Sequence, residues 1–303
     1  MKNLLSMNDL SIKELVEIIK FTEEIKRYPD EYGEELKGKT LVMIFERPST
    51  RTRISFESAM LQLGGHTIDV TRDSTQLERG ETIADSAKVL SRYVDAIVAR
   101  VDRHDTLTEL AKNSSVPVIN GLSDLEHPCQ AISDLFTVYE IKGELKGINI
   151  SYIGDGNNVC HSLLLGCAMT GMNLKVASPK GYEPKKYILN SAVKISKKTG
   201  CTIDVINDPN EAVRDADFIY TDVWVSMGHE KEEEKRVEVF KKYQINQRIL
   251  ANAKKDCKVM HCLPAHRGME ITDDVLDGPN SIVWDQAENR LHAQKAILLK
   301  LLK

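Results

Sequence analysis

The segment FERPSTRTRISFE, residues 45–57, concentrates positive charge and hydroxyl groups within a few positions. Its three arginines, Arg47, Arg51 and Arg53, lie beside the hydroxyl side chains of Ser49, Thr50 and Thr52. The apolar run TLVMIF precedes it and helical spacing follows it, so we expect a turn from a strand into a helix. A helix N-terminus offers unpaired N–H groups and partial positive charge, which guanidinium groups reinforce. The alternative is an ordinary N-cap with solvated arginines, but two hydroxyls alternating with two arginines favour a phosphate site.

Two other segments carry groups that can act on a carbonyl. HPCQ places His127 and Gln130 at a predicted helix start, where both can donate to one carbonyl oxygen, although a lone histidine is more often structural. HCLPAHRG offers Cys262 beside His261 and His266, which predicts either a nucleophilic thiol paired with histidine or a thiol that only lines a pocket. A transition-metal site needs three or four convergent ligands, and no fourth candidate has suitable spacing. We therefore expect no metal.

The segment GDGNNVCHS invites comparison with a dinucleotide-binding turn, because it follows a strand-like run and opens a helical one. The third glycine position is Val159, however, and the next strand-like run, NLKVASP, ends without the acidic residue that would hold a ribose. This pattern disfavours nicotinamide binding. Asn157 and Asn158 are then either helix caps or amides that hold the carboxylate of a small ligand.

The segment DVWVSMG puts an acid, Asp222, on the same loop as Ser226, Trp224 and Met227. One interpretation is structural, with tryptophan and methionine in the core and the acid capping a strand end. The other is a site that receives an ammonium group beside an apolar chain. Taken together, the loops predict an oxyanion pocket, donors directed at a carbonyl, and a second pocket suited to an amino acid.

These motifs follow strand-like runs in a chain where strands and helices alternate. Strands are expected at residues 40–45, 66–70, 95–101, 116–119, 148–153, 174–177, 202–206, 218–223, 258–263 and 281–284. A first helix is expected after a capping box formed by Ser11 and Glu14. The alternation predicts parallel sheets covered by helices, and ten strands favour two open α/β sheets over one. Ligands of such sheets lie at the carboxyl ends of the strands.

Composition indicates a soluble globular chain of two domains, with 303 residues, 42% hydrophobic residues, 28% charged residues and a net charge of -4. The glycine-punctuated stretch YEIKGELKG suggests domains at residues 1–142 and 143–303, with the C-terminal helix, from about residue 285, packing back on the first domain. The densest charge run, HEKEEEKRVE, is expected to begin a solvated helix.

Several classes of protein are disfavoured by the same composition. No apolar run approaches the roughly 20 residues of a membrane span, and the N-terminus lacks the apolar stretch of a signal peptide. Net acidity disfavours a nucleic-acid surface. The six cysteines show no CxxC pair, which favours reduced thiols and a cytoplasmic location.

The motifs STRTR followed by SFE, HPCQ, GDGNNVCHSLL, DVWVSMG and HCLPAHRG resemble those of the aspartate/ornithine transcarbamoylase family, in that family's order and over nearly the whole chain. The last three resemble the members that use ornithine rather than aspartate, whereas ERP before STRTR looks closer to the aspartate enzymes. The resemblance implies two open parallel-sheet α/β domains with the active site in the cleft between them. It also implies a homotrimer or a multiple of trimers, no cofactor, and a place in arginine biosynthesis or, in reverse, in citrulline breakdown.

The resemblance further implies a role for individual positions. Carbamoyl phosphate would be bound by Ser49, Thr50, Arg51, Thr52, Gln76, Arg100, His127, Gln130, Cys262, Leu263 and Arg290. L-ornithine would be bound by Asn158, Asp222, Ser226 and Met227. Within these sets the catalytic residues would be Arg51, Arg100, His127 and Cys262. The implied reaction transfers the carbamoyl group to the side-chain amine of ornithine and releases phosphate.

Three alternatives stay open at the level of sequence. A carbamoyltransferase could use another acceptor, putrescine or aspartate. A nicotinamide-dependent dehydrogenase would require dinucleotide binding at GDGNN, which the missing glycine disfavours. A non-catalytic anion-binding protein could retain the STRTR turn alone, but the intact acceptor loops argue against it.

Overall fold

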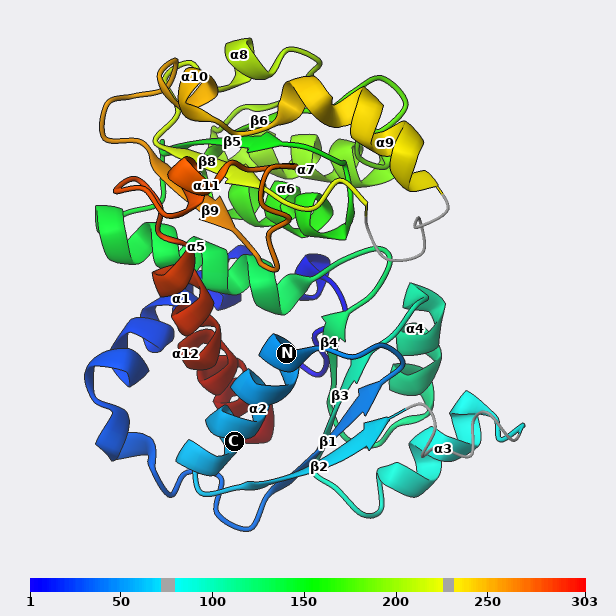
Figure 1. Ribbon diagram of the computed structural model, residues 1–303. Coiled ribbons are helices and arrows are strands. Elements are labelled where there is room, and N and C mark those ends of the chain that lie inside the picture. The colour runs from blue at the N-terminus through cyan, green and yellow to red at the C-terminus, as the bar shows by residue number, and fades with distance from the viewer. Residues whose placement is uncertain (72–79, 226–231) are drawn as a thin grey trace. The chain divides into compact units, whose positions relative to one another are not determined.

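The computed structural model describes residues 1–71, 80–225 and 232–303. Within these ranges, no helix is long and apolar enough to cross a membrane. The chain divides into two compact units, unit 1 with Met1–Phe136 and Asn289–Lys303, and unit 2 with Thr137–Glu288 (Figure 1).

Unit 1 is built on a four-stranded sheet in the order β2-β1-β3-β4, with every neighbouring pair parallel. Its elements are 3-10 helices at Met7–Asp9 and Pro29–Tyr32, strands β1 (Thr40–Phe45), β2 (His66–Thr71), β3 (Ala96–Arg100) and β4 (Val118–Leu122), and helices α1 (Ile12–Arg27), α2 (Thr50–Gln62), α3 (Ile83–Leu90) and α4 (His104–Asn113). Helix α5 (Pro128–Lys142) begins in unit 1 and ends in unit 2, and α12 (Val283–Leu302) begins in unit 2 and ends in unit 1.

The central strands β1 and β3 of unit 1 are apolar because both faces of the sheet are covered there, which is typical of parallel sheets. Val42 and Ile44 of β1 pack in one cluster with Leu107 of α4 and Ala87 of α3. The intervening residue Met43 faces the other way and is fully buried. Figure 1 shows α3 and α4 on one side of this sheet and α2 and α12 on the other.

Helix α1 begins as its sequence predicts. The Ser11 side chain accepts from the backbone N–H of Glu14 at 3.2 Å, and the Glu14 carboxylate accepts from the N–H of Ser11 at 2.8 Å. This confirms the expected capping box, which satisfies two N–H groups that a helix start would otherwise leave unpaired.

Unit 2 is built on a five-stranded parallel sheet in the order β7-β6-β5-β8-β9. Its strands are β5 (Asn149–Ile153), β6 (Asn173–Ala177), β7 (Ile203–Ile206), β8 (Phe218–Thr221) and β9 (Lys258–His261). Its helices are α6 (Asn158–Thr170), α7 (Lys186–Thr199), α8 (Pro209–Ala212), α9 (Glu233–Phe240), α10 (Gln247–Leu250), α11 (Asp273–Leu276) and a 3-10 helix at Lys241–Tyr243.

The core of unit 2 also has two faces. Ile153, Ile219 and Val259, from three adjacent strands, pack in one cluster with Phe240 of α9 and Val275 of α11. Alternating residues point to the opposite face, where the rings of Tyr152 and Tyr220 stack with centroids 5.8 Å apart. The two sheets confirm the predicted fold class of two open parallel-sheet α/β domains.

One predicted strand, residues 281–284, is wrong. Ser281 makes only an isolated bridge to Val259, and the chain enters α12 at Val283. The run SIVW has the apolar, β-branched composition of a strand. The Trp284 side chain is nevertheless 60% exposed on the first turn of the helix, so the run is a helix start.

Candidate functional site

The turn between β1 and α2 has the geometry of a capped helix start. Ser49 has extended backbone angles, φ -153° and ψ 104°, and its hydroxyl accepts from the N–H of Thr52 at 3.3 Å. The N–H groups of Thr50 and Arg51 also belong to the first turn, where helix geometry supplies no intrahelical acceptor. This end of α2 therefore favours an anion.

The three arginines of the opening segment have different surroundings. The Arg47 Nε lies 2.6 Å from an oxygen of Asp102, and the Arg53 Nε lies 3.0 Å from an oxygen of Asp69. No carboxylate among the described residues pairs with Arg51. Of the three cations, Arg51 is thus the one that no carboxylate balances in the part of unit 1 that the structure describes.

Two further arginines lie on elements that neighbour this turn. Arg290 of α12 donates from Nη2 to the hydroxyl oxygen of Thr52 at 2.9 Å, and both residues are almost completely buried. Arg100 ends β3, next to β1 in the sheet. Unit 1 therefore has the Thr52 hydroxyl and the N-terminus of α2 on elements that neighbour those of Arg100 and Arg290.

His127 comes immediately before α5, and its carbonyl accepts from the N–H groups of Gln130 and Ala131 at 3.1 and 3.2 Å. Its imidazole is buried, and burial together with the positive charges of Arg290 and Arg100 holds the pKa of His127 well below its usual range. The ring is therefore neutral at pH 7. A neutral imidazole donates one hydrogen bond without adding a third charge.

Gln130 is fully buried, and its Nε2 donates to an oxygen of Asp134 at 2.9 Å. Its Oε1 is buried with no hydrogen-bond partner among the described residues. Asp134 takes one of the two N–H groups of this amide, so the second can still donate to a carbonyl oxygen, as the sequence suggested. The buried Oε1 also offers an acceptor, which fits an N–H group of a ligand.

In unit 2, Asp222 directly follows β8 and its carboxylate is buried. One oxygen accepts from the N–H of Val223 at 2.8 Å and from the thiol of Cys262 at 3.0 Å. The other accepts from Nδ2 of Asn157 at 2.7 Å. None of these donors carries positive charge, and no lysine or arginine among the described residues pairs with Asp222. A carboxylate has about four lone-pair sites, so it can still accept from an ammonium group.

Asn157, which the sequence offered either as a helix cap or as an amide that holds a carboxylate, caps α6 and also contacts Asp222. Its side-chain oxygen caps α6 by accepting from the N–H groups of Val159 and Cys160, and it also accepts from the hydroxyl of Tyr152 at 3.2 Å. Its amide nitrogen holds Asp222, as described above. The predicted ligand residue, Asn158, is the first residue of α6 and is half-buried.

Cys262 and Leu263 follow β9 in a constrained turn. Leu263 has φ 58°, a left-handed conformation that non-glycine residues adopt only when contacts hold it. Its N–H donates to Nδ1 of His261 at 2.9 Å, while Nε2 of His261 lies 3.0 Å from Glu270. Both nitrogens of His261 are thus engaged and the Cys262 thiol points to Asp222, so the hypothesis of a nucleophilic cysteine paired with His261 loses support.

The same residues bear on metal binding. Ligand atoms of Asp222, His261 and Cys262 lie within 4.8 Å of one another. Nδ1 of His261 already accepts from Leu263, however, and a tetrahedral site needs a fourth ligand or a water. A metal at this position would have to displace hydrogen bonds that hold the turn.

The turn that resembles a dinucleotide motif is covered by the chain itself. A Cβ placed on Gly156 would lie 2.2 Å from the backbone nitrogen of Pro184, and the N–H of Gly156 donates to Tyr182. A dinucleotide motif uses its central glycine to let the pyrophosphate approach the backbone. Here the glycine admits the loop after β6 instead, which argues against nicotinamide binding.

Three predicted ligand residues, Gln76, Ser226 and Met227, lie outside the described residues. The remaining residues form two clusters, named by their units. The unit 1 cluster contains Ser49, Thr50, Arg51, Thr52, Arg100, His127, Gln130 and Arg290, and the unit 2 cluster contains Asn157, Asn158, Asp222, Cys262 and Leu263.

Family models match nearly the whole chain. One described as "Aspartate/ornithine carbamoyltransferase, carbamoyl-P binding domain" matches residues 2–140. One described as "Aspartate/ornithine carbamoyltransferase, Asp/Orn binding domain" matches residues 146–301.

Individual proteins are similar over the same length. The ornithine carbamoyltransferase of Archaeoglobus fulgidus is 55% identical, with 100% of this chain and 98% of that protein covered. That of Pyrococcus horikoshii is 57% identical over 88% of this chain and 84% of that protein. The solved structure of the ornithine carbamoyltransferase from Pyrococcus furiosus has a TM-score of 0.95 at 52% identity, covering 98% of this chain and 96% of that chain.

Proposed function

Because this chain belongs to the aspartate/ornithine carbamoyltransferase family, we propose that it transfers the carbamoyl group of carbamoyl phosphate to the side-chain amine of L-ornithine, giving L-citrulline and phosphate. The observation that carries the proposal is a pair of opposite charges without charged partners among the described residues, Arg51 in unit 1 and Asp222 in unit 2. The first suits a phosphate and the second suits the α-ammonium group of ornithine.

The unit 1 cluster suits carbamoyl phosphate group by group. Arg51 and the N-terminus of α2 bind the phosphate and offset its charge as it leaves. Arg100 and neutral His127 donate to the carbonyl oxygen, where negative charge develops as the amine attacks. One such donor is worth roughly 3 to 4 kcal/mol of barrier. The acceptor Oε1 of Gln130 suits the carbamoyl NH₂. Carbamoyl phosphate is already activated, so the reaction needs no cofactor.

The unit 2 cluster distinguishes between acceptors. Asp222 attracts the α-ammonium of ornithine, and the amide of Asn158 suits its carboxylate. Aspartate would bring a second carboxylate toward Asp222, and like charges at short range repel. Putrescine supplies a second ammonium but leaves Asn158 without a carboxylate. Ser226 and Met227 complete this site in the proposal.

The experiment that tests the function is a colorimetric ureido assay with carbamoyl phosphate and ornithine, putrescine or aspartate in parallel. We expect product with ornithine, and far less with the other two amines. Product with putrescine or aspartate alone would overturn the acceptor assignment. No product with any of the three amines would overturn carbamoyl transfer.

We also propose a homotrimer, or a multiple of trimers, in the cytoplasm, working in arginine biosynthesis. Six free cysteines are compatible with a reducing compartment. The biosynthetic direction is supported by the ornithine carbamoyltransferase of Pyrococcus furiosus, which is named anabolic and is 52% identical to this chain.

In the proposed trimer, Gln76 reaches the phosphate pocket of a neighbouring subunit. Mixing Arg51→Ala and Gln76→Ala subunits should then restore activity, because one subunit's Arg51 can combine with another's Gln76. Trimers that mix without recovering activity would show that Gln76 serves its own subunit.

A further inference from the structure

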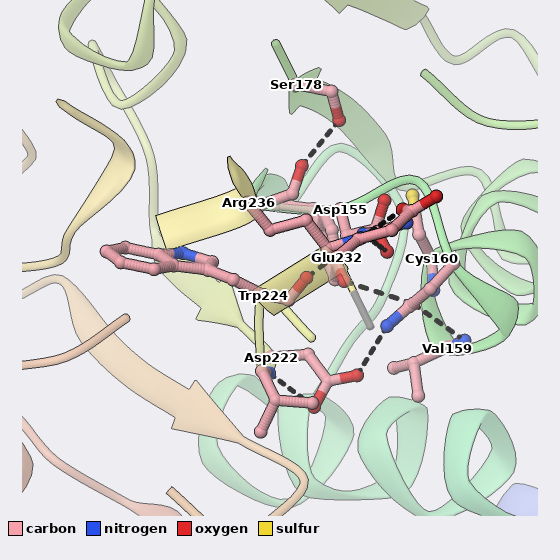
Figure 2. A network of polar contacts seen from close by, with 12 residues as sticks. Asp155, Val159, Cys160, Ser178, Asp222, Trp224, Glu232 and Arg236 are labelled. Carbon is pink, nitrogen blue, oxygen red and sulfur yellow. Dashed lines mark hydrogen bonds and ion pairs between the residues drawn. The ribbon is translucent and has the colours of Figure 1, made fainter. Parts of the chain in front are cut away.

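Arg236 of α9 belongs to a charge run that was expected to be solvated, yet its side chain is only 6% exposed. Its Nη1 donates to Asp155 at 2.9 Å and to the carbonyl oxygen of Trp224 at 3.0 Å. Its Nε donates to Glu232 at 3.2 Å, and its guanidinium carbon lies 4.9 Å from the ring centroid of Tyr182. Figure 2 shows this guanidinium between the turn after β5 and the loop after β8.

Two of these partners are neighbours of the acceptor site. Asp155 is two residues before Asn157, and Trp224 is two residues after Asp222. Asn157 and Asp222 are themselves joined by the 2.7 Å hydrogen bond between Nδ2 and Oδ2. Arg236 therefore ties together the two segments whose relative position sets this bond (Figure 2).

The contacts of Arg236 suit positioning rather than ligand binding. Among the described residues, it contacts a carboxylate and a carbonyl through Nη1, a second carboxylate through Nε, and an aromatic ring through the guanidinium. A guanidinium presents its donors in one rigid plane, so its partners are fixed relative to one another. Groups held in this way keep a binding site within the narrow tolerance that function requires.

A second ion pair, between Asp217 and Lys254, lies at the opposite ends of the same two strands. Asp217, just before β8, accepts from Nζ of Lys254 at 2.9 Å and from the N–H of Asn149, the first residue of β5, at 2.9 Å. This pair is far along the strands from Asp222, because parallel strands keep their amino ends at one edge. It provides a matched control for the loss of an ion pair from unit 2.

We propose that Arg236 is a positioning residue for the amino-acid acceptor, which it affects by fixing Asp222 against Asn157 without touching the substrate. The inference rests on the proposed function for the identity of that acceptor. All residues that contact Arg236 within the described part of the chain lie in unit 2. We therefore expect Arg236 to affect the binding of the acceptor and not that of carbamoyl phosphate.

The test compares Arg236→Met, Arg236→Lys and Lys254→Met with the wild type in steady-state kinetics. We expect Arg236→Met to raise the KM for ornithine at least about tenfold, since a displacement of about 1 Å in a positioning group can cost more than this. The KM for carbamoyl phosphate should change less than twofold. Arg236→Lys keeps a charge for Asp155 but loses the planar fork, so it should be intermediate, whereas Lys254→Met should leave both KM values unchanged.

Hydrogen exchange of the backbone at residues 222–225, measured by mass spectrometry, gives a readout that does not depend on activity. Exchange should rise in Arg236→Met and not in Lys254→Met. The inference is overturned if Arg236→Met leaves the ornithine KM at the wild-type value, or raises both KM values equally. A wild type inactive with ornithine would instead overturn the proposed function. In that case hydrogen exchange at residues 222–225 would still test the positioning role of Arg236. Equal exchange in Arg236→Met and Lys254→Met would overturn that role.

Discussion

The unit 1 and unit 2 clusters are built in the same way and carry opposite charges. Each gathers polar groups at the carboxyl ends of adjacent parallel strands, followed by a helix start. Within the described part of the chain, the cation Arg51 of unit 1 has no carboxylate partner, and the anion Asp222 of unit 2 accepts only from uncharged donors. In the proposed function, each substrate brings the charge opposite to the one that its unit leaves unbalanced.

Paired charges elsewhere in the two units make the contrast sharper. Arg53 is compensated by Asp69 and Asp217 by Lys254, and neither is expected to meet a substrate. Exposed pairs contribute little to stability, and the median is about 0 to 1 kcal/mol. Arg51 and Arg53, like Asp222 and Asp217, are residues of one type that lie close in sequence. Within the described part of the chain, the second member of each pair has a partner of opposite charge and the first does not.

The largest expected effect is that of Arg51→Met. We expect kcat/KM for carbamoyl phosphate to fall by about a thousandfold, because the charge acts on phosphate in both the ground state and the transition state. The control is Arg53→Met, which removes a half-exposed arginine that pairs with Asp69 and Glu57 and should change activity less than about twofold. Similar losses of kcat/KM in Arg51→Met and Arg53→Met would contradict the distinction between the unbalanced and the paired arginine.

The next effect concerns the other charge. Asp222→Asn should raise the KM for ornithine by roughly a hundredfold, in line with the loss of one partner of a buried charge pair, and leave the KM for carbamoyl phosphate unchanged. Asp217→Asn is the control, since it removes a carboxylate from the amino end of the same strand. Steady-state kinetics check both variants. A shared defect for both substrates would show that the two clusters do not act separately.

A smaller effect, about tenfold, is expected from pH. The attacking amine of ornithine must be neutral, and an amine with a pKa of about 10.4 gains about tenfold in its neutral fraction from pH 7 to pH 8. The KM for ornithine should fall accordingly, whereas that for carbamoyl phosphate should not. Initial rates at the two pH values measure this. A constant ornithine KM would mean that the protein itself deprotonates the amine.

The smallest effect is on stability. Burial and two arginines lower the pKa of His127 in the folded state, so below pH 6.5 the unfolded chain binds a proton that the folded chain does not. Stability should fall as pH drops, by up to about 1.4 kcal/mol from pH 6.5 to 5.5. Urea unfolding should show this loss reduced in His127→Gln and retained in His66→Gln, which changes an exposed histidine. If the free energy of unfolding of His127→Gln falls as much as that of the wild type, His127 is not the cause of the loss.

The sequence predicts the fold and the positions of the loops better than the roles within them. Alternating strands and helices place the motifs at strand ends, because local patterns carry that information. The local sequence around Asn157 predicts a helix cap or a ligand amide. It does not predict the hydrogen bond to Asp222, because that bond joins residues 65 positions apart. Arg236 likewise sits in a run of charges that looks solvated, and only the fold brings Asp155 and the carbonyl of Trp224 to it. Long-range contacts of this kind have no local pattern.

The most direct test of the two-cluster account is calorimetric titration of carbamoyl phosphate into the wild type, Arg51→Met and Asp222→Asn. The account predicts that Arg51→Met loses binding, because the phosphate loses its unbalanced cation, and that Asp222→Asn binds as tightly as the wild type. Equal weakening in both variants would contradict the assignment of one substrate to each unit.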